Sequence, residues 1–404
     1  MQNAVANPKE GTLARLKQPL PCGDAKRRVV LISEIISPYR IPVFNALAKN
    51  KGLELHVIFL AETDAALRQW RIYKDEICFS YQILPSWRLR AGNHKLLVNW
   101  GLRGALGRFQ PDAIVCGGYN YPASWIALSW ASHHRVDLIL WSESNVGDAR
   151  SNSKWLKLFK SRFVAKCNGF VVPGRSASDY LRTLGAINNI SIAPNAIDNE
   201  YFAARAAQIL DRPDDFRTKW QLPPRFLLFV GRLVSEKGTF DLLRAYAKLD
   251  RNLRSKVGLV FAGDGPCRKQ LERDAAGVEG AIRFIGFVQR EELPGLYAIS
   301  DALVLPTHSD PWGLVVNEAM ACGTPAIVTD VAGCARDLIE HGQNGYIVQK
   351  CNPDELHSVI NEYLSTPEKR QQLGLRCLET IRGYSPEACA EGIAASVTSG
   401  VEAA

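Results

Sequence analysis

Short apolar runs alternate with amphipathic stretches along most of the chain, and this alternation predicts a β–α architecture. Runs such as VVLIS, HVIF, AIVC and LILW are short and continuous, as in strands that are buried on both faces of a parallel sheet. The stretches between them, such as PASWIALSWASHH, place apolar residues at helical spacing. Such alternation indicates parallel sheets that are covered by helices on both sides.

The β–α pattern occurs twice. Its first series runs from Arg28 to Asp198, a polar and charge-rich segment follows at about 203–218, and the buried run FLLFV then opens a second series. We therefore predict an α/β fold of two Rossmann-like, doubly wound domains with parallel sheets. The predicted divisions are a disordered tail at 1–26, an N-terminal domain at 27–205, a C-terminal domain at 206–380 and a last helix at 381–404 that returns to the N-terminal domain.

The composition is that of a globular chain. Of the 404 residues, 47% are hydrophobic and 22% charged, which excludes a fully disordered chain, a collagen-like repeat and a coiled coil. No stretch reaches the roughly 18 uninterrupted apolar residues of a membrane-spanning helix, and the first 26 residues lack the apolar region of a secretory signal. We expect a cytoplasmic protein. The net charge of +8 is compatible with phosphate-bearing ligands or an anionic membrane surface, and we expect no nucleic-acid partner.

The ten cysteines are scattered, without a C-x-x-C pair or a histidine at metal-ligand spacing beside them. We interpret them as reduced, buried thiols. The chain also has no D-x-D pair of carboxylates, so we expect neither a metal nor another cofactor.

Ligands of open parallel sheets bind beyond the carboxyl ends of the strands, so the loops after the predicted strands are the candidate sites. After FLLFV, Arg232 and Lys237 precede a helix N-terminus, which suits a diphosphate, although two solvated surface cations explain the same loop. In the G-D-G-P that follows VGLVFA, Gly265 lets a backbone approach a base or phosphate closely, but a tight turn explains it equally well.

The loop after ALVLP holds the most specific pattern. Asp310 and Glu318 are eight positions apart and flank Gly313, beyond which a helix begins near Leu314 or Val315. The free amides of such a helix N-terminus favour an anion, and a carboxylate is the natural acceptor for a pair of sugar hydroxyls. The alternative is that Glu318 only stabilises the helix dipole.

These segments resemble the retaining GT-B glycosyltransferases, and glycosyltransferase family 4 in particular. The resemblance is densest from Phe229 to Val348, where GRLVSEKG, AGDGP, FIGFV, the loop at 310–328 and GCARDLIEHGQNGYIV follow in the family's order and spacing. It extends more loosely to APNAID at 193–198 and to YSPEACAEGIAASV at 384–397. It implies a GT-B fold, in which two domains face a cleft and the nucleotide-sugar binds mainly to the second.

The resemblance also implies roles for single residues. Arg232 and Lys237 would hold the donor diphosphate, and Glu318, the second glutamate of the family's E-x7-E motif, would bind the ribose. Asp310 stands where the first glutamate of that motif contacts the donor sugar, and its side chain is one methylene shorter. The residues expected to face the sugar, the phosphates or the base with their backbone are Gly265, Gly313, Leu314 and Val315.

The N-terminal half departs from the family. Where family members carry a glycine-rich loop after the first strand, Tyr39 and Arg40 could shape an acceptor pocket, or a plain turn could precede the helix. Glu143 occupies the place of a frequent family histidine and could orient the acceptor hydroxyl or accept its proton. Gly118 and Tyr119 follow another strand and are further candidates on the acceptor side.

The segment KWLKLFKSRF at 154–163 is both basic and aromatic. Residues 150–182 hold eight basic side chains against one acidic side chain. The apolar residues that share one face of the predicted helix are Trp155, Leu158, Phe159 and Phe163. We expect this face to pack against the sheet, and peripheral contact with an anionic membrane is the alternative.

Together these patterns predict a retaining, metal-independent glycosyltransferase. It would move a sugar from a nucleoside-diphosphate-sugar to a hydroxyl of a glycan or lipid-linked acceptor, in lipid-linked glycan or exopolysaccharide assembly. The predicted catalytic residues are Arg232, Lys237, Asp310 and Glu143. One alternative is a nucleotide-sugar-binding subunit that has lost transfer. A dinucleotide-dependent oxidoreductase is disfavoured, because neither half has G-x-G-x-x-G after its first strand.

Overall fold

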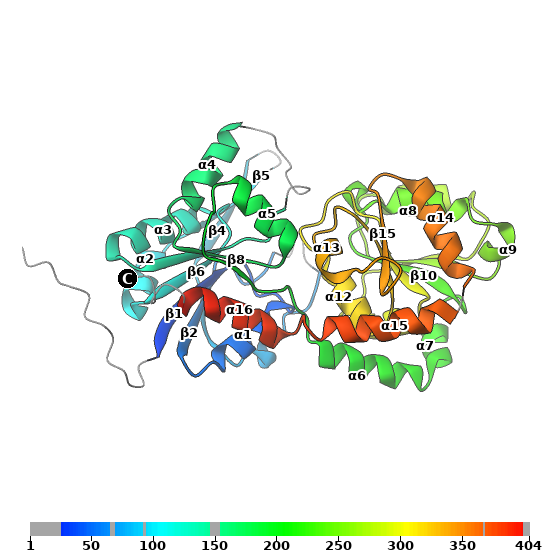
Figure 1. Ribbon diagram of the computed structural model, residues 1–404, viewed down its shortest axis with the longest axis horizontal. Coiled ribbons are helices and arrows are strands. Elements are labelled where there is room, and N and C mark those ends of the chain that lie inside the picture. The colour runs from blue at the N-terminus through cyan, green and yellow to red at the C-terminus, as the bar shows by residue number, and fades with distance from the viewer. Residues whose placement is uncertain (1–25, 65–68, 92–93, 146–153, 367, 399–404) are drawn as a thin grey trace, which may run out of the picture.

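The computed structural model describes residues 26–64, 69–91, 94–145, 154–366 and 368–398, which form two lobes side by side (Figure 1). Each lobe is built on its own parallel sheet with helices on both faces, so the predicted fold of two doubly wound α/β domains is confirmed. Except for Lys26, the predicted tail at 1–26 lies outside the described residues, as does the end of the last segment at 399–404.

The first domain contains a seven-stranded parallel sheet in the order β3-β2-β1-β6-β7-β8-β9. Its strands are β1 (Arg27–Ser33), β2 (Leu53–Phe59), β3 (Ser80–Ile83), β6 (Ala113–Gly117), β7 (Asp137–Trp141), β8 (Gly169–Val172) and β9 (Ile190–Ile192). Between β3 and β6 the chain forms an antiparallel hairpin of β4 (Ser86–Ala91) and β5 (His94–Asn99), which the hydrophobic pattern did not predict.

The helices of the first domain cover both faces of its sheet. They are α1 (Arg40–Ala48), α2 (Leu102–Phe109), α3 (Pro122–His134), α4 (Lys154–Val164) and α5 (Arg175–Thr183), with a 3₁₀ turn at Lys74–Glu76. Along β1, Val29 and Leu31 pack with α1, whereas Val30 and Ile32 pack with α2 and α3. Because successive residues of a strand point to opposite faces, a strand between two helix layers must be apolar throughout.

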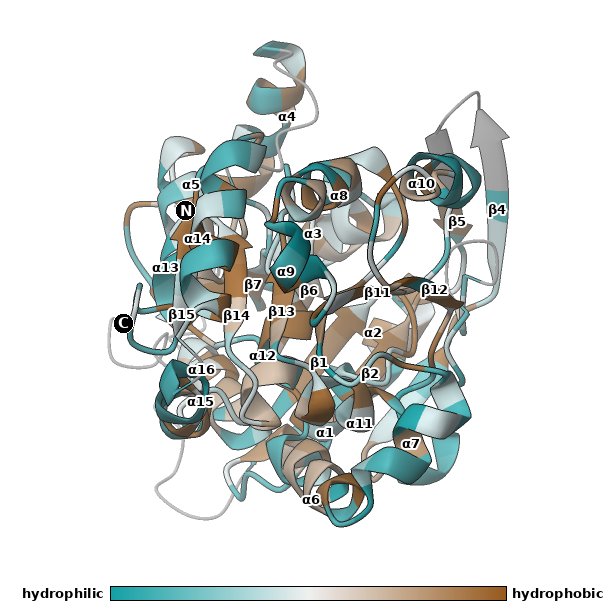
Figure 2. Ribbon diagram, turned by 90° about the vertical axis from the view of Figure 1, so that its right-hand side faces the viewer, coloured by the Kyte–Doolittle hydropathy of each residue, from teal (hydrophilic) through white to brown (hydrophobic). Residues whose placement is uncertain are grey.

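The second domain contains a six-stranded parallel sheet in the order β12-β11-β10-β13-β14-β15. Its strands are β10 (Phe226–Val230), β11 (Gly258–Ala262), β12 (Ile282–Gly286), β13 (Ala302–Leu305), β14 (Ala326–Thr329) and β15 (Gly345–Val348). Its helices are α8 (Thr239–Ala247), α9 (Arg251–Arg254), α10 (Arg268–Ala275), α11 (Leu293–Ile299), α12 (Leu314–Ala321), α13 (Ala335–Leu338), α14 (Pro353–Leu364) and α15 (Glu368–Ile381), with a 3₁₀ turn at Ser235–Lys237. As Figure 2 shows, brown apolar strands lie inside and teal polar helix faces lie outside.

The segment between the two sheets is helical rather than an open linker. It forms α6 (Asn199–Leu210) and α7 (Pro213–Trp220), whose apolar residues Phe202, Ala206 and Phe216 join the core of the second domain. The predicted division between 205 and 206 therefore falls inside a helix that packs against α11 and α12. The last helix, α16 (Pro386–Thr398), lies against α1, β8 and β9 of the first domain (Figure 1).

Helix α4 projects from the body of the first domain (Figure 1). Phe163 is buried and Phe159 stacks near Trp125 with ring centroids 4.2 Å apart, but Trp155 is 81% exposed. The expectation that the whole apolar face packs against the sheet is wrong, because only the C-terminal half of α4, from Phe159 onward, contacts the domain. Among the helices that the structure describes, none is long and apolar enough to cross a membrane.

Candidate active site

Two adjoining cavities of about 550 Å³ each lie between the domains, at the carboxyl ends of the strands. We call them the central cavity, which both domains line, and the side cavity, which lies beside the loops after β10 and β11. Both sheets change strand order here, since β1 lies between β2 and β6 and β10 lies between β11 and β13. Such switch points are where doubly wound sheets bind ligands.

The structure brings every predicted site residue to one of these cavities. The residues that line the central cavity are Tyr39, Arg40, Gly118, Tyr119, Glu143, Lys237, Asp310, Gly313, Leu314, Val315 and Glu318. Arg232 and Gly265 line the side cavity. Tyr39, Lys237, Val315 and Glu318 line both, so one extended ligand could occupy the two cavities across these side chains.

Close backbone packing holds the loops after β10, β11 and β13 together. A Cβ atom on Gly238 would lie 1.8 Å from the Pro306 carbonyl oxygen, and one on Gly263 would lie 1.9 Å from that of Gly231. Gly265 approaches the Leu233 carbonyl oxygen in the same way, at 2.4 Å from its ideal Cβ position. Only glycine fits at such distances, so these residues fix the shape of the floor beneath the cavities.

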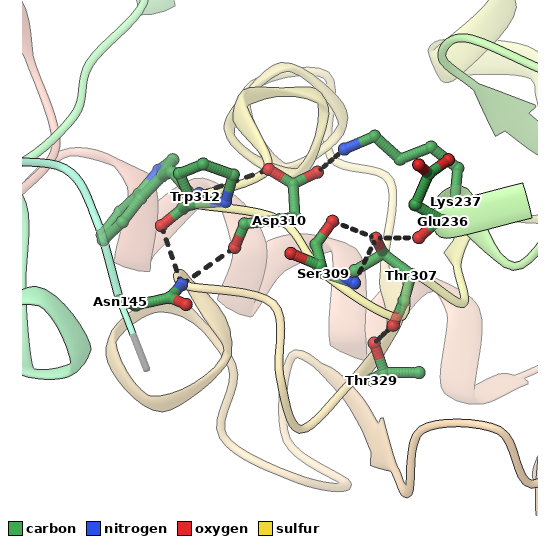
Figure 3. Close-up of polar contacts among 9 residues, drawn as sticks. Asn145, Glu236, Lys237, Thr307, Ser309, Asp310, Trp312 and Thr329 are labelled. Atoms are coloured by element: carbon green, nitrogen blue, oxygen red, sulfur yellow. Dashed lines mark hydrogen bonds and ion pairs between the residues drawn. The ribbon is translucent and has the colours of Figure 1, made fainter. Parts of the chain in front are cut away.

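Lys237 and Asp310 form an ion pair across this floor (Figure 3). Both side chains are largely buried, at 24% and 13% exposure. Asp310 also accepts a hydrogen bond from the Trp312 amide, at 3.3 Å. Thr307 ties the two loops together, because its hydroxyl donates to the Glu236 carbonyl at 3.0 Å. The loop after β13 is thus held at both ends around the ion pair.

Helix α12 presents its N-terminus to the central cavity. Gly313 precedes it with φ of +97°, a conformation that glycine adopts without strain. The amides of Gly313, Leu314 and Val315 donate no hydrogen bond to any other residue that the structure describes. Unpaired amides and the positive end of the helix dipole make this point suitable for a phosphate.

Glu318 is fully buried at the junction of the two cavities. Its Oε2 accepts a hydrogen bond from the Tyr297 hydroxyl, whereas its Oε1 has no partner among the described residues. Burial raises the pKa of Glu318 to about 7, against the opposing effect of the Tyr297 and Tyr39 hydroxyls. Burial and the Glu318 carboxylate raise the pKa values of both tyrosines, so their hydroxyls stay protonated and can donate.

Arg40 and Glu143 form an ion pair on the first-domain side of the central cavity. The Arg40 guanidinium lies 4.2 Å from the centre of the Trp141 ring and donates to the Asn195 side chain at 3.2 Å. Arg40 is also the first residue of α1, so this helix begins at the cavity. Glu143 is 37% exposed and remains accessible to a ligand.

Gly118 and Tyr119 take different positions in the loop after β6. Gly118 has φ of +92° and open space where a Cβ would lie. The Tyr119 side chain is buried, with its ring 6.2 Å from that of Phe163. Tyr119 therefore shapes the wall of the central cavity while most of its ring packs in the domain core.

The sequence did not single out three asparagines that join the two domains. Asn145 donates from its side chain to the carbonyl oxygens of Asp310 at 3.0 Å and Pro311 at 3.3 Å (Figure 3). Asn317 accepts from the Trp312 indole at 2.8 Å and donates to the carbonyl of Asn195 at 2.9 Å. The only available signal was their position, because Asn145 follows a strand and Asn195 lies in APNAID.

A second set of contacts closes the far flank of the side cavity. Arg290 forms an ion pair with Glu76 of the first domain and lies 4.0 Å from the centre of the Tyr73 ring. Tyr73 donates to Glu291 at 2.8 Å. The side cavity is thus enclosed by both domains, with an aromatic wall that includes Trp70.

Two family models match the chain in succession. The model "Glycosyltransferase Family 4" matches residues 43–201, and the model "Glycosyl transferases group 1" matches residues 211–376. The second range contains the whole second sheet, whereas the first range begins inside α1, after β1, and contains the other strands of the first sheet. The nine residues between the two ranges, 202–210, lie in α6.

Individual proteins with similar sequences include glycosyltransferases as well. An uncharacterised glycosyltransferase of Methanocaldococcus jannaschii is 39% identical over 143 residues, which are 35% of this chain and 36% of that relative. The alignment thus spans about a third of its length. Glycogen synthase of Mycobacterium tuberculosis is 29% identical over 308 residues, covering 72% of this chain and 69% of the relative.

The fold also matches a solved structure closely. The Anabaena protein HepE in complex with UDP and glucose has a TM-score of 0.71 and 17% sequence identity, covering 92% of this chain and 100% of that chain. The predicted resemblance is therefore confirmed at the level of family and fold. The chain belongs to the glycosyltransferases of group 1 and family 4, with the GT-B fold.

Proposed function

We propose that the protein transfers a sugar from a nucleoside-diphosphate-sugar to an acceptor hydroxyl, with the donor on the second domain and the acceptor on the first. The observation that carries this proposal is the buried Glu318 carboxylate at the junction of two cavities, whose Oε1 has no hydrogen-bond partner among the residues that the structure describes. A ribose diol would supply hydrogen bonds to it. From that point the side cavity accommodates a base, and the central cavity accommodates the diphosphate and sugar.

The diphosphate would lie between Lys237, Arg232 and the N-terminus of α12. Arg232 is exposed and forms no ion pair with another described residue, so its charge is available to a ligand. As the glycosidic bond breaks, negative charge builds on the leaving diphosphate, and fixed cations and amides stabilise it. We propose that these groups act without a divalent metal; turnover that is equal with and without added Mg²⁺ would support this.

The acceptor would enter beside Arg40 and Glu143. The ion pair holds the Glu143 carboxylate next to the central cavity, where it can orient a hydroxyl or receive its proton. We propose a glycan or lipid-linked acceptor and transfer with retention of configuration. Because HepE was crystallised with UDP and glucose, UDP-glucose is the first donor to test.

The proposal is tested by measuring binding of UDP-, GDP- and ADP-sugars to the purified protein, followed by product analysis with glycan and lipid-linked acceptors. We expect one nucleotide base to bind best and its sugar to be transferred, with anomeric configuration read by NMR. Binding without transfer or donor hydrolysis under any of these conditions would instead identify a nucleotide-sugar-binding subunit. Absence of binding to every nucleotide would overturn the proposal.

Asp310 offers a sharper test of the donor pose. If its carboxylate contacts the donor sugar directly or through a water, Asp310→Ala should lower transfer about 10²-fold while the affinity for the free nucleoside diphosphate stays within about threefold. Asp310→Asn is the matched control, because its amide oxygen can still accept from the Trp312 amide. A parallel loss of both affinities in Asp310→Ala would mean that this side chain holds the loop rather than the sugar.

We also propose that α4 rests on an anionic membrane, at the cytoplasmic face. Trp155, Leu156 and Leu158 are exposed beside Lys154 and Lys157, so apolar and basic groups project together. Co-sedimentation with phosphatidylglycerol vesicles should exceed that with phosphatidylcholine vesicles and should fall in Trp155→Ala. Trp87→Ala, at another exposed tryptophan, is the control, and equal loss in both variants would contradict a specific role of α4.

A further inference from the structure

Three residues that are far apart in the chain meet on the second domain, namely Asp241, His308 and Cys351. The first and the last are 110 positions apart. Asp241 lies in the first turn of α8, His308 lies in the loop after β13, and Cys351 lies between β15 and α14. A carboxylate oxygen, an imidazole nitrogen and the thiol sulfur of these residues all lie within 4.8 Å of one another. Because these residues are so far apart in the chain, no sequence motif indicates that they form a cluster.

We propose that these three side chains bind a thiophilic divalent cation, with Zn²⁺ as the physiological ion. Thiolate, imidazole and carboxylate are the three ligand types that zinc prefers, and one carboxylate with one thiolate neutralises its charge. Tetrahedral bonds of about 2.0–2.3 Å place ligand atoms about 3.3–3.8 Å apart. The His308 and Asp241 atoms, now 2.6 Å apart, therefore need to separate by about 0.7 Å, and atoms as far apart as 4.8 Å need to approach by about 1 Å. A fourth position would remain for water.

A backbone hydrogen bond positions His308, and a side-chain ion pair positions Asp241. His308 donates its amide to the Glu236 carbonyl at 2.8 Å, and its Nε2 already lies 2.6 Å from Asp241 Oδ2. The cation would take the place of the proton between these two atoms. Asp241 is buried, and its other oxygen, Oδ1, is paired with Arg244, so the carboxylate is oriented from its far side as ligating carboxylates commonly are.

Cys351 is exposed and has φ of +56°, a left-handed conformation that is uncommon for a residue with a side chain. Its neighbours keep it there. The Lys350 amide donates to Asp330 at 3.1 Å, and the Asn352 side chain caps α14 by accepting from the Glu355 amide at 3.1 Å. The exposed thiol also corrects the expectation that the cysteines are buried, since Cys78 is exposed as well. Backbone strain of this kind is typical of ligand sites.

A cation here would fix the loop of the proposed donor site, because His308 is two residues before Asp310. Only this consequence rests on the proposed function. The binding site itself involves none of the residues that line the two cavities, so it can be tested without any substrate.

The experiment is titration of chelator-treated, full-length protein with Co²⁺, followed by competition with Zn²⁺. We expect one equivalent to bind with thiolate-to-cobalt charge-transfer absorption, and Zn²⁺ to displace it and raise the melting temperature. Cys351→Ser should abolish the charge-transfer band. His308→Gln and Asp241→Asn should each weaken binding by about 100-fold or more, since even outer partners of a metal site are worth 10–100-fold.

Cys78→Ser is the matched control, because Cys78 is the other exposed thiol of the described chain. It should leave both the band and the affinity unchanged. Cys351→Ser changes an exposed side chain, so its fold should survive, and circular dichroism checks this. Absence of stoichiometric Co²⁺ binding, or a charge-transfer band that persists in Cys351→Ser, would overturn the proposal. Transfer activity enters neither outcome, so failure of the proposed function would be seen separately.

Discussion

The loops after β1 and β10 occupy equivalent places in the two domains, each following the strand beside which the strand order reverses. They are held in different ways. After β10, Gly231–Gly238 packs its backbone directly on the loops after β11 and β13, with glycine at each closest approach. After β1, six residues lead into α1. Backbone hydrogen bonds tie this loop to the loop after β2, from Ala61 to Glu34 at 2.9 Å and from Ile36 to Glu62 at 3.2 Å, whereas its contacts across the cavity are made by the side chain of Arg40.

This difference separates a rigid half of the site from an adaptable one. Glycine-to-carbonyl packing leaves the second domain one arrangement of its loops, which suits the diphosphate that we propose for this side. On the first domain, the shape of the cavity depends on Arg40, Trp141, Glu143 and Asn195, any of which a substitution can change without moving the backbone. On the proposed division of the site, acceptor specificity can therefore diverge while donor binding stays the same.

The largest expected effect compares two glycines that both have positive φ. Gly238→Ala places a Cβ 1.8 Å from a carbonyl oxygen, whereas Gly118→Ala meets nothing within 4 Å. We expect Gly238→Ala to lower the free energy of unfolding by about 4 kcal/mol or more, because the end of β13 must move. Gly118→Ala should lower the free energy of unfolding by about 1–2 kcal/mol, which is the cost of a positive φ for a residue with a Cβ atom.

Urea unfolding of both variants, with equal m-values required, measures the two losses. If they are equal, the donor loops are no more tightly constrained than the acceptor loop, and the comparison between the halves fails.

The next effect concerns the cations on the rigid half. Lys237→Ala and Arg232→Ala should each lower kcat/KM about 10²–10³-fold, as expected for loss of one fixed group that stabilises the leaving diphosphate. Lys248→Ala is the matched control, because Lys248 pairs with Asp354 on the exposed surface away from both cavities. If Lys237→Ala differs from this control by less than about threefold, Lys237 serves only the ion pair with Asp310.

Glu318, which we propose to bind the donor ribose, should change its charge with pH. Its folded pKa of about 7 lies above the ordinary value of 4.5, so the protonated form is favoured by folding. The resulting stabilisation is complete below pH 4.5 and is lost as the pH rises through about 7, up to about 3 kcal/mol. Glu318→Gln should therefore melt at a higher temperature than the wild type at pH 8, and the difference should shrink toward pH 5.

The substitution that stabilises the fold at pH 8 should weaken the binding of nucleotides. Glu318→Gln should weaken it about 10–150-fold, because a charged acceptor of hydroxyl hydrogen bonds is lost. A 2′,3′-dideoxynucleotide should bind the wild type about as weakly. Tyr297→Phe removes a donor that lowers the pKa of Glu318, so this variant should lose nucleotide binding at a higher pH than the wild type does as the pH is lowered. If Glu318→Gln still distinguishes the two nucleotides, Glu318 does not bind the ribose.

The comparison also explains which parts of the molecule the sequence predicts. The double β–α series is visible because strands between two helix layers must be apolar throughout, as β10 is from Phe226 to Val230. The donor loops are recognisable because close backbone approach permits only glycine, and this leaves a fixed spacing in the chain. Both kinds of signal come from local constraint on residue type.

Contacts between distant side chains leave no such record. Asn145 and Asp310 are 165 positions apart, and neither residue type nor spacing indicates that they meet. The same holds for the Arg290–Glu76 pair, whose partners lie on different domains. Trp155 was misjudged for a related reason: helical periodicity shows that a face is apolar, but the angle at which α4 leaves the domain decides how much of it is covered.

The smallest expected effect lies on the adaptable half, at Glu143. Because the carboxylate is paired with Arg40, we expect it to orient the acceptor, so Glu143→Gln should raise the acceptor KM about tenfold and leave the donor Kd within about threefold. Arg40→Lys should act similarly, because lysine keeps the charge but loses the fork that reaches Glu143 and Asn195 together. Glu340→Gln, at an exposed carboxylate outside both cavities, is the control.

A fall in kcat of about 10²-fold or more at saturating acceptor would instead assign Glu143 to proton transfer. A change in donor affinity would show that the two halves are not independent, because the Arg40–Asn195–Asn317 contacts would then transmit the substitution to the loop that holds Asp310.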